Sequence, residues 1–250
     1  MARAALPGRL AVVRRLNWHV GKVVDVRDET PAARTLVLEV PLWPGHLAGQ
    51  HVDVRLTAED GYSTQRSYSI AAPADGSRIE LTVQRVDDGE VSPYLTQVVE
   101  VGDEIELRGP VGGWFVWRPE STAPVLLVAG GSGIVPLMAM VRARRTPVPF
   151  RLLYSVRGPD DRYYVDELRR PTPGLDVTYL YTRSAPDDWP RPPGRLGVAD
   201  LTTAGWPPDF TPDCFLCGPT GFVETAADIL QALGHDPRRI KTERFGPSGG

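Results

Sequence analysis

The 250-residue sequence contains little cysteine and little histidine. Its two cysteines, Cys214 and Cys217, lie in an apolar run that is typical of a strand. Three strand residues span roughly 10 Å and odd spacings point to opposite faces, whereas a disulfide requires Cα atoms within roughly 7 Å. We therefore expect no disulfide. The four histidines are scattered without the spacing of metal ligands, so we also expect no metal site; they are His19, His46, His51 and His235.

The sequence also lacks a strong charge excess and a long apolar run. A net charge of -3 argues against nucleic acid as the main partner. No stretch has the length of a membrane span or of a secretory h-region. With 42% hydrophobic and 24% charged residues, the composition is that of a soluble globular protein. We expect a cytoplasmic monomer with no membrane partner.

The first two dozen residues are basic, although the whole chain is mildly acidic. A solvated arm is the favoured interpretation, and a docking surface for an acidic protein is the alternative. The residues concerned are Arg3, Arg9, Arg14, Arg15 and Lys22.

Short β-branched runs separated by turn residues follow, and they predict an antiparallel β-barrel or sandwich over residues 1–118. The Gly- and Pro-rich segment 109–121 breaks this pattern and marks the boundary. One short helix, 93–99, interrupts the strands. The expected strands cover 21–27, 34–40, 51–56, 67–71, 78–86 and 104–108.

From 119 to 250 the pattern changes to alternating strands and helices, which predicts a parallel sheet covered by helices. The helix at 221–233 is the clearest, because its apolar residues follow helical spacing and Gly234 supplies a stop. The other expected helices are 136–145 and 163–169, and the expected strands are 125–129, 150–155, 175–181, 214–217 and 239–244.

A glycine turn, Gly130 to Val135, stands between an apolar strand and a helix. Glycines at such a turn let backbone N–H groups approach an anion at the positive end of the helix. The same unit also occurs without a ligand, so the turn alone leaves both interpretations open.

Another candidate site is the segment Arg66 to Ile70 in the first half of the chain. On a strand, Arg66 and Tyr68 share one face while Ser67 and Ser69 share the other. A guanidinium beside an aromatic plane suits a phosphate-bearing ligand with a flat ring. An ordinary barrel strand is the alternative.

Three motifs together resemble the ferredoxin–NADP reductase superfamily of FAD-dependent oxidoreductases. They are Arg66-x-Tyr68-Ser69 in the β half, the glycine turn continued to Pro136, and Cys217-Gly218-Pro219. The resemblance extends roughly from Trp18 to Phe245. It implies an FAD-binding β-barrel followed by an NAD(P)-binding α/β domain.

For FAD, the resemblance implies that Arg66 pairs with the pyrophosphate, that Tyr68 stacks on the isoalloxazine and that Ser69 bonds near flavin N5. Phe245 would lie over the ring. For Ser92, a plain helix N-cap is the alternative to a phosphate contact. The remaining expected FAD residues are Ser67, then Val83 and Arg85 on the AMP side, and Gly89, Val91 and Ser92 in a pyrophosphate loop.

For the nicotinamide coenzyme, the resemblance places Cys217 beside the nicotinamide C4, and a buried core role is its alternative. Val135 replaces the threonine that is common in the family, so one hydroxyl contact is missing. The other expected residues are Gly130, Gly131, Ser132, Gly133, Gly218 and Pro219.

Coenzyme choice depends on the residues that follow the second α/β strand, where a cation favours a 2′-phosphate. NADPH is favoured, while Asp160 and Asp161 keep NADH open. Ser155 and Arg157 follow this strand, and the residues that favour NADPH are Arg157, Arg162 and Tyr164.

By resemblance, Glu243 joins Ser69 and Cys217 as a catalytic candidate in proton transfer or radical stabilisation; an ordinary last strand is equally consistent. We expect a hydride to pass from NAD(P)H to FAD, and electrons then to a separate protein such as a ferredoxin or an oxygenase component. Two cysteines cannot build a four-cysteine iron–sulfur cluster within this chain. The alternatives are direct reduction of free flavin, ferric chelates or quinones, and a flavin electron-transfer subunit of a larger complex.

Overall fold

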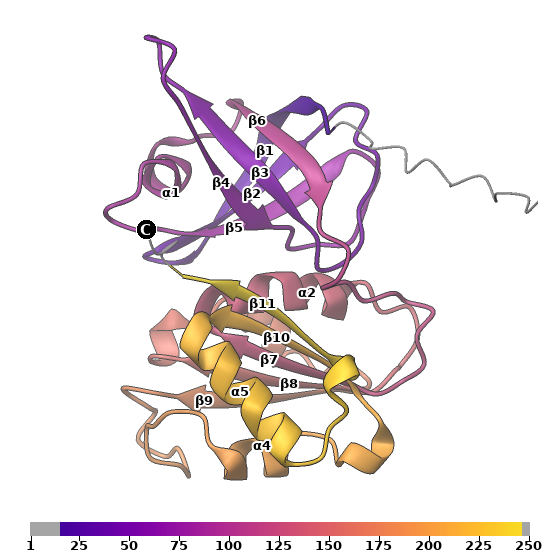
Figure 1. Cartoon of the computed structure of the whole chain (residues 1–250). Coiled ribbons are helices and arrows are strands. Elements are labelled where there is room, and N and C mark those ends of the chain that lie inside the picture. Colours follow the sequence, from indigo (N-terminus) through magenta and orange to yellow (C-terminus); the bar gives the residue numbers. More distant parts are fainter. Residues whose placement is uncertain (1–15, 247–250) are drawn as a thin grey trace, which may run out of the picture.

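The computed structural model describes residues 16–246, which form two sheets stacked one above the other (Figure 1). The basic residues Arg3, Arg9, Arg14 and Arg15 and the segment 247–250 lie outside the described residues. Within the described part, none of the helices has the length and apolar character needed to cross a membrane.

The first sheet is an antiparallel barrel of six strands in the order β4-β3-β6-β1-β2-β5. Val52 and Val54 point into its core while Asp53 between them is partly exposed, as strand alternation requires. A bridge between Ile70 and Leu81 joins its two edges. The strands are β1 (Trp18–Thr30), β2 (Ala33–Glu39), β3 (His51–Thr57), β4 (Ser63–Ser69), β5 (Arg78–Gln84) and β6 (Glu104–Val111).

A short helical segment follows β5 and contacts β4. It consists of α1 (Val91–Pro93) and a π-helical turn, Tyr94–Val98, which together correspond to the predicted helix. Leu95 on this segment is buried in the barrel core.

The second sheet is parallel, in the order β11-β10-β7-β8-β9. The strand order reverses between β7 and β10, and ligands of open α/β sheets bind at such a switch point, beyond the carboxyl ends of the strands. The strands are β7 (Val125–Gly130), β8 (Phe150–Val156), β9 (Leu175–Tyr181), β10 (Asp213–Pro219) and β11 (Ile240–Phe245).

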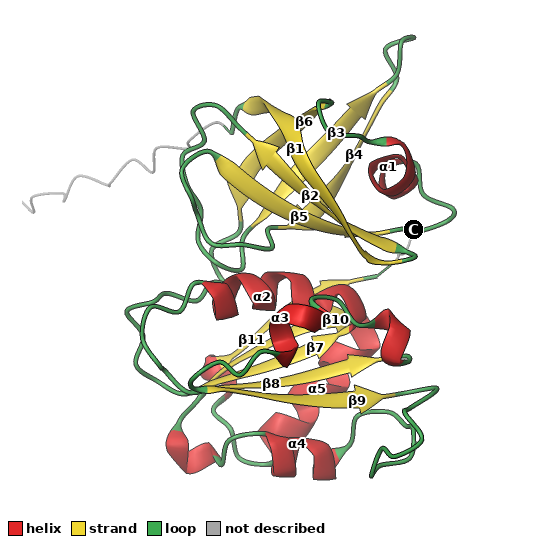
Figure 2. Cartoon of the chain, turned by 180° about the vertical axis from the view of Figure 1, so that it is seen from behind, coloured by secondary structure: helices red, strands yellow, loops and turns green. Residues whose placement is uncertain are grey.

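Helices cover both faces of the parallel sheet (Figure 2). The face toward the barrel carries α2 (Ile134–Arg142) and α3 (Val165–Arg169), and the far face carries α4 (Val198–Ala204) and α5 (Thr220–Ala232). The sequence missed α4, because this seven-residue helix buries only Leu201 and so has no helical periodicity to detect.

The predicted two-part organisation is confirmed as two sheets. The first ends at Val111 and the second begins at Val125. The boundary at 118/119 lies between these residues and stays a prediction.

Two polar clusters hold the barrel and the α/β half together. In the first, Tyr164 donates its hydroxyl to Thr82 Oγ1 at 2.6 Å and its backbone N–H to Glu29 Oε2 at 2.9 Å. Thr35 closes the ring, because its hydroxyl lies 2.7 Å from both Thr82 Oγ1 and Glu29 Oε1. We call these four residues the interface ring.

The second cluster is centred on Arg142 at the end of α2. Its guanidinium donates three hydrogen bonds to Glu167, and it also donates to the carbonyl of Ala71 and to Glu80 in the barrel. It also lies 4.8 Å from the centre of the Tyr164 ring. Apolar contacts complete the interface, since Phe115 and Trp117 share a core with α2.

Candidate functional site

Two glycine turns meet at the switch point of the parallel sheet. One follows β7, and the other is Gly218 at the end of β10. A Cβ on Gly218 would lie 3.0 Å from the Cα of Gly130, and a Cβ on Gly133 would collide with the carbonyl oxygen of Cys217. These glycines are required because side chains would push the two strand ends apart.

Gly131 has a different role in the same turn. Its φ of +54° is a left-handed conformation that favours glycine, and no described residue other than its two neighbours in the chain has an atom within 4 Å of the place where a Cβ would be. The turn therefore presents open backbone at Gly131 and Ser132, and it leads directly into α2. This open backbone fits the pyrophosphate of a dinucleotide. The side chain of Val135 has no polar atom and is buried in the core, so it offers a ligand no polar contact.

Cys217 is fully buried, and burial raises the pKa of its thiol well above the usual range. Cys214 points to the opposite face of the sheet, as the strand interpretation predicted. A neutral, buried thiol supports the packing role for Cys217. Its position beside the nicotinamide stays a prediction.

On the barrel, β4 presents the predicted flavin residues. Tyr68 and Arg66 lie opposite Val52 and Val54, so they share a face as predicted. Tyr68 is partly buried against the barrel core. Arg66 is exposed, and among residues 16–246 it donates only to Thr64 and Gln65 beside it. Its guanidinium therefore retains donors for an anion.

Ser67 lies on the opposite face of β4 and donates to Asp53 at 2.7 Å. Asp53 also accepts from Arg108 at 2.8 Å. The Ser67 side chain is therefore engaged within the barrel wall and fits a cofactor only through its backbone.

Ser69 stands directly opposite His51 in the ladder of β3 and β4. The imidazole Nδ1 of His51 lies 3.9 Å from Oε1 of Glu243, on β11 of the other sheet. Glu243 is in turn directly opposite Cys217. The three predicted catalytic residues thus lie along one line of neighbours that crosses the domain interface.

The environment of Glu243 is unusual for a carboxylate. Burial raises the pKa of Glu243 to about 7, and its Oε2 is buried with no hydrogen-bond partner among residues 16–246. An unpaired buried polar atom is costly, which indicates a site built to meet another group. Phe245, two residues further on, is partly buried beside the same end of β10.

The loop before α1 is held by Ser92, whose hydroxyl accepts the backbone N–H of Val86 at 3.0 Å. The N-cap interpretation of Ser92 is wrong, because the helix begins at Val91 and Glu90 occupies the cap position. Gly89 belongs to the same turn, donating its N–H to Val86. Val91 and Val83 are buried in the barrel core, so their side chains cannot face a cofactor.

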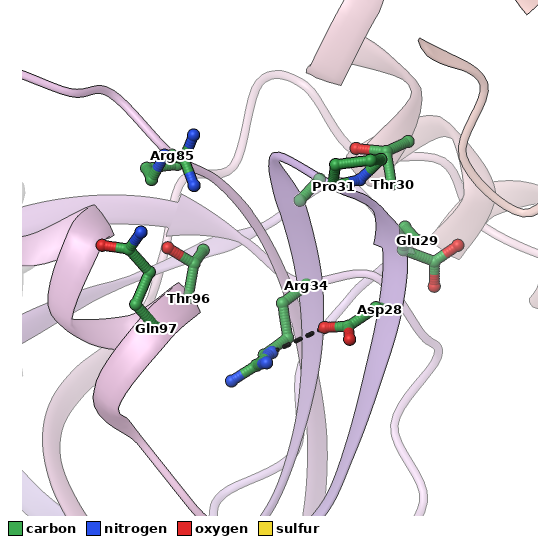
Figure 3. A pocket seen from close by; sticks show the side chains of 9 residues that line it. Asp28, Glu29, Thr30, Pro31, Arg34, Arg85, Thr96 and Gln97 are labelled. Atoms are coloured by element: carbon green, nitrogen blue, oxygen red, sulfur yellow. Dashed lines mark hydrogen bonds and ion pairs between the residues drawn. The ribbon is translucent and has the colours of Figure 1, made fainter. Parts of the chain in front are cut away.

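Arg85 lines a hollow of about 400 Å³ beside the π-helical turn Tyr94–Val98 (Figure 3). Across this hollow lies Arg34, which is paired with Asp28 at 2.8 Å. Arg85 is itself paired with Asp87. Arg85 is the residue of this hollow that the resemblance assigns to the AMP side of FAD, and that assignment stays a prediction.

The predicted coenzyme-selecting residues separate in the structure. Arg157 is exposed after β8, and within residues 16–246 its guanidinium has no hydrogen-bond or ion-pair partner. Ser155 is buried. Arg162 donates to the carbonyl of Pro159 and lies over the Tyr179 ring. The assignment of Tyr164 to the coenzyme is wrong, since its side chain is buried in the interface ring.

Two features were missed by sequence reasoning. His51 carries no motif, and its proximity to Glu243 arises only when the two sheets pack together. Arg183 follows β9, and its backbone N–H donates to the carbonyl of Arg157 at 2.9 Å, so a second exposed arginine stands beside the first. The sequence could have indicated Arg183, because it is a cation that directly follows a strand next to β8.

The fold and the site define a two-domain protein with a flavin half-site on a barrel and a dinucleotide half-site on a parallel sheet. Residues 21–116 match the family described as Oxidoreductase FAD-binding domain. Residues 127–228 match the family described as Oxidoreductase NAD-binding domain.

Curated relatives extend over nearly the whole chain. A flavohemoprotein of Chromobacterium violaceum is 33% identical over 94% of this chain and 62% of its own length. A glycine betaine monooxygenase reductase subunit of Pseudomonas aeruginosa is 31% identical over 92% of this chain and 65% of its own length. The chain thus spans less than two thirds of these relatives.

Among solved structures, the flavohem-like FAD/NAD binding domain of nitric oxide dioxygenase from Vibrio cholerae superposes with a TM-score of 0.80. It is 27% identical, and the match covers 92% of this chain and 99% of that one. The chain belongs to the ferredoxin–NADP reductase superfamily, and its cofactors are FAD and a nicotinamide coenzyme.

Proposed function

We propose that this chain takes a hydride from NAD(P)H and passes electrons through FAD to a separate redox protein, such as a ferredoxin or an oxygenase component. The observation that carries the proposal is the contact between His51, opposite Ser69 on the barrel, and Glu243, opposite Cys217 on the parallel sheet. It supports the proposal because it joins β3 and β11, which pair with the strands β4 and β10 to which the flavin half-site and the nicotinamide half-site are assigned.

Each half-site has a defined task. Arg66 would bind the FAD pyrophosphate and Tyr68 would pack on its ring, while Gly131 and Ser132 would bind the coenzyme pyrophosphate. The buried thiol of Cys217 shapes the floor between the two ligands. Bound FAD supplies the hydride-accepting and single-electron chemistry, and the protein supplies position and electrostatics.

Similarity to an oxygenase reductase subunit supports a protein acceptor. A haem protein is a second candidate acceptor, because the chain is also similar to a flavohemoprotein. A monomer with a cytoplasmic location completes the proposal.

The test measures NADPH and NADH oxidation by the FAD-loaded protein with cytochrome c, with and without added ferredoxin. Stimulation by ferredoxin supports the proposal. Equal rates with free flavin or ferric chelates alone would favour a small-molecule reductase. Bound flavin without turnover on any soluble acceptor would favour a subunit that works only inside its complex.

FAD binding has its own test. Arg66→Ala and Tyr68→Ala should each weaken FAD retention during gel filtration, since one removes the anion partner and the other the ring contact. Arg78→Ala, an exposed arginine at the start of β5, is the matched control. Wild-type protein that cannot be loaded with FAD would refute the proposal.

A further inference from the structure

The contact between His51 and Glu243 joins strands of two different sheets. His51 Nδ1 and Glu243 Oε1 are 3.9 Å apart, which is within ion-pair range and about 1 Å beyond hydrogen-bond length. A small side-chain rotation or one bridging water completes a hydrogen bond between them. Both side chains are largely buried, with 26% and 23% of their surface exposed.

The groups around this pair are few. Besides His51, the titratable group beside Glu243 is the neutral thiol of Cys217 across the β10–β11 ladder. His51 also faces Asp53 on its own strand, but Asp53 is paired with Arg108 and bonded by Ser67. The Nδ1–Cε1 edge of the His51 ring also lies beside Gly112, which has no side chain. Within the described part of the chain, the Glu243 carboxyl therefore has no ion-pair partner other than His51.

We propose that His51 is a positioning residue for Glu243, with which it shares a single proton across the domain interface. The inference rests on the proposed function, in which Glu243 lies where flavin and nicotinamide meet. When Glu243 releases its proton, His51 Nδ1 takes it up, so one O–H bond breaks, one N–H bond forms and the total charge of the pair is unchanged.

Sharing a proton explains how a carboxyl can be kept in this buried position. An isolated buried carboxylate is expensive, whereas a pair with one proton is either neutral or a compensated ion pair. Burial raises the pKa of Glu243 to about 7 and lowers the pKa of His51, so burial favours the neutral form of each group. Such groups titrate as a pair.

The first test is a proton NMR titration of the His51 ring in the purified full-length chain. The chain has only four histidines, so His51→Gln assigns the signal. Glu243→Gln should lower the pKa of His51 by about one unit, because the protonated imidazole then lacks the carboxylate that the shared proton leaves behind. Glu120→Gln, near the opposite end of β10, should leave it unchanged. An unchanged His51 titration in Glu243→Gln would overturn the proposal.

Glu243→Asp covers the case in which Glu243→Gln fails to fold, because it keeps the charge. It should leave the pKa of His51 closer to the wild-type value than to that of the free imidazole in the denatured chain. A His51 titration in Glu243→Asp identical to that of the denatured chain would also overturn the proposal.

The second test is the pH profile of flavin reduction by NADPH in rapid mixing. His51→Gln should move the midpoint of this profile by more than about half a unit, whereas His19→Gln should not. A rate lowered equally at every pH would indicate a merely structural role and overturn the proposal. If the wild-type flavin is not reduced by NADPH or NADH, the proposed function fails, and the NMR titration still decides whether the pair shares a proton.

Discussion

Thr82→Val is expected to weaken the docking of the two domains, because Thr82 is the middle member of the interface ring. The substitution removes the acceptor of the Tyr164 hydroxyl and the contact to Thr35. Tyr164 and Thr82 are both buried, with 5% of each residue exposed, so water cannot replace the lost partner.

The magnitude follows from the hydrogen bonds. A buried hydroxyl left without a partner costs about 1–3 kcal/mol, and the lost contact to Thr35 adds about 1 kcal/mol. Thr82→Val should therefore lower the free energy of unfolding by about 2–4 kcal/mol. Tyr164→Phe should cost only about 1 kcal/mol, because Thr82 keeps Thr35 as a partner.

Urea unfolding measures these values, with tryptophan fluorescence and circular dichroism as two probes. The double variant Thr82→Val/Tyr164→Phe leaves no orphaned hydroxyl, so its cost should fall short of the sum by about 1 kcal/mol or more. Tyr62→Phe, which removes an exposed hydrogen bond to Glu90, is the control. Strict additivity, or a Tyr164→Phe cost no larger than that of Tyr62→Phe, would refute the reasoning.

Three further predictions concern the α/β half. Gly133→Ala should lower the free energy of unfolding in urea by about 3 kcal/mol or more, because the new methyl group meets the carbonyl of Cys217. Gly131→Ala should lower it by only about 1 kcal/mol, through backbone strain. Equal losses in the two variants would contradict this prediction. The folded-state pKa of Glu243, about 7, exceeds the unfolded value of 4.5, so the free energy of unfolding should fall as pH rises from 4.5 through 7. Glu243→Gln should reduce this pH dependence of the free energy of unfolding. An unchanged pH dependence in the variant would exclude Glu243 as its source. Arg157→Ala should raise KM for NADPH at least about tenfold more than KM for NADH, with Arg118→Ala as control; equal effects would reject a 2′-phosphate contact.

The strand and helix pattern was predictable from local sequence because each element carries its own signal. β7 is buried along its whole length and ends in glycine, and α5 repeats its apolar residues at helical spacing. The ends of the elements were less predictable. β1 extends from Trp18 to Thr30, since its outer residues pair with β6 and β2 although they lack β-branched alternation.

Contacts between the domains were not predictable. Tyr164 lies seven residues after Arg157 and was assigned to the coenzyme on that proximity. Tyr164 instead has a left-handed backbone, with φ of +55°, and its side chain points into the interface with the barrel. His51 and Glu243 illustrate the same limit, because no local pattern reports which strand of another domain a side chain will meet.

The burial of both cysteines has a practical consequence for labelling. Burial raises the pKa of Cys214 to about 12 and the pKa of Cys217 well above its usual range, so neither thiol reacts readily with maleimides in the folded protein. The sequence has no other cysteine. A single cysteine introduced at exposed Arg183 or Asp60 would therefore take up a fluorophore or spin label alone, without removal of the native thiols.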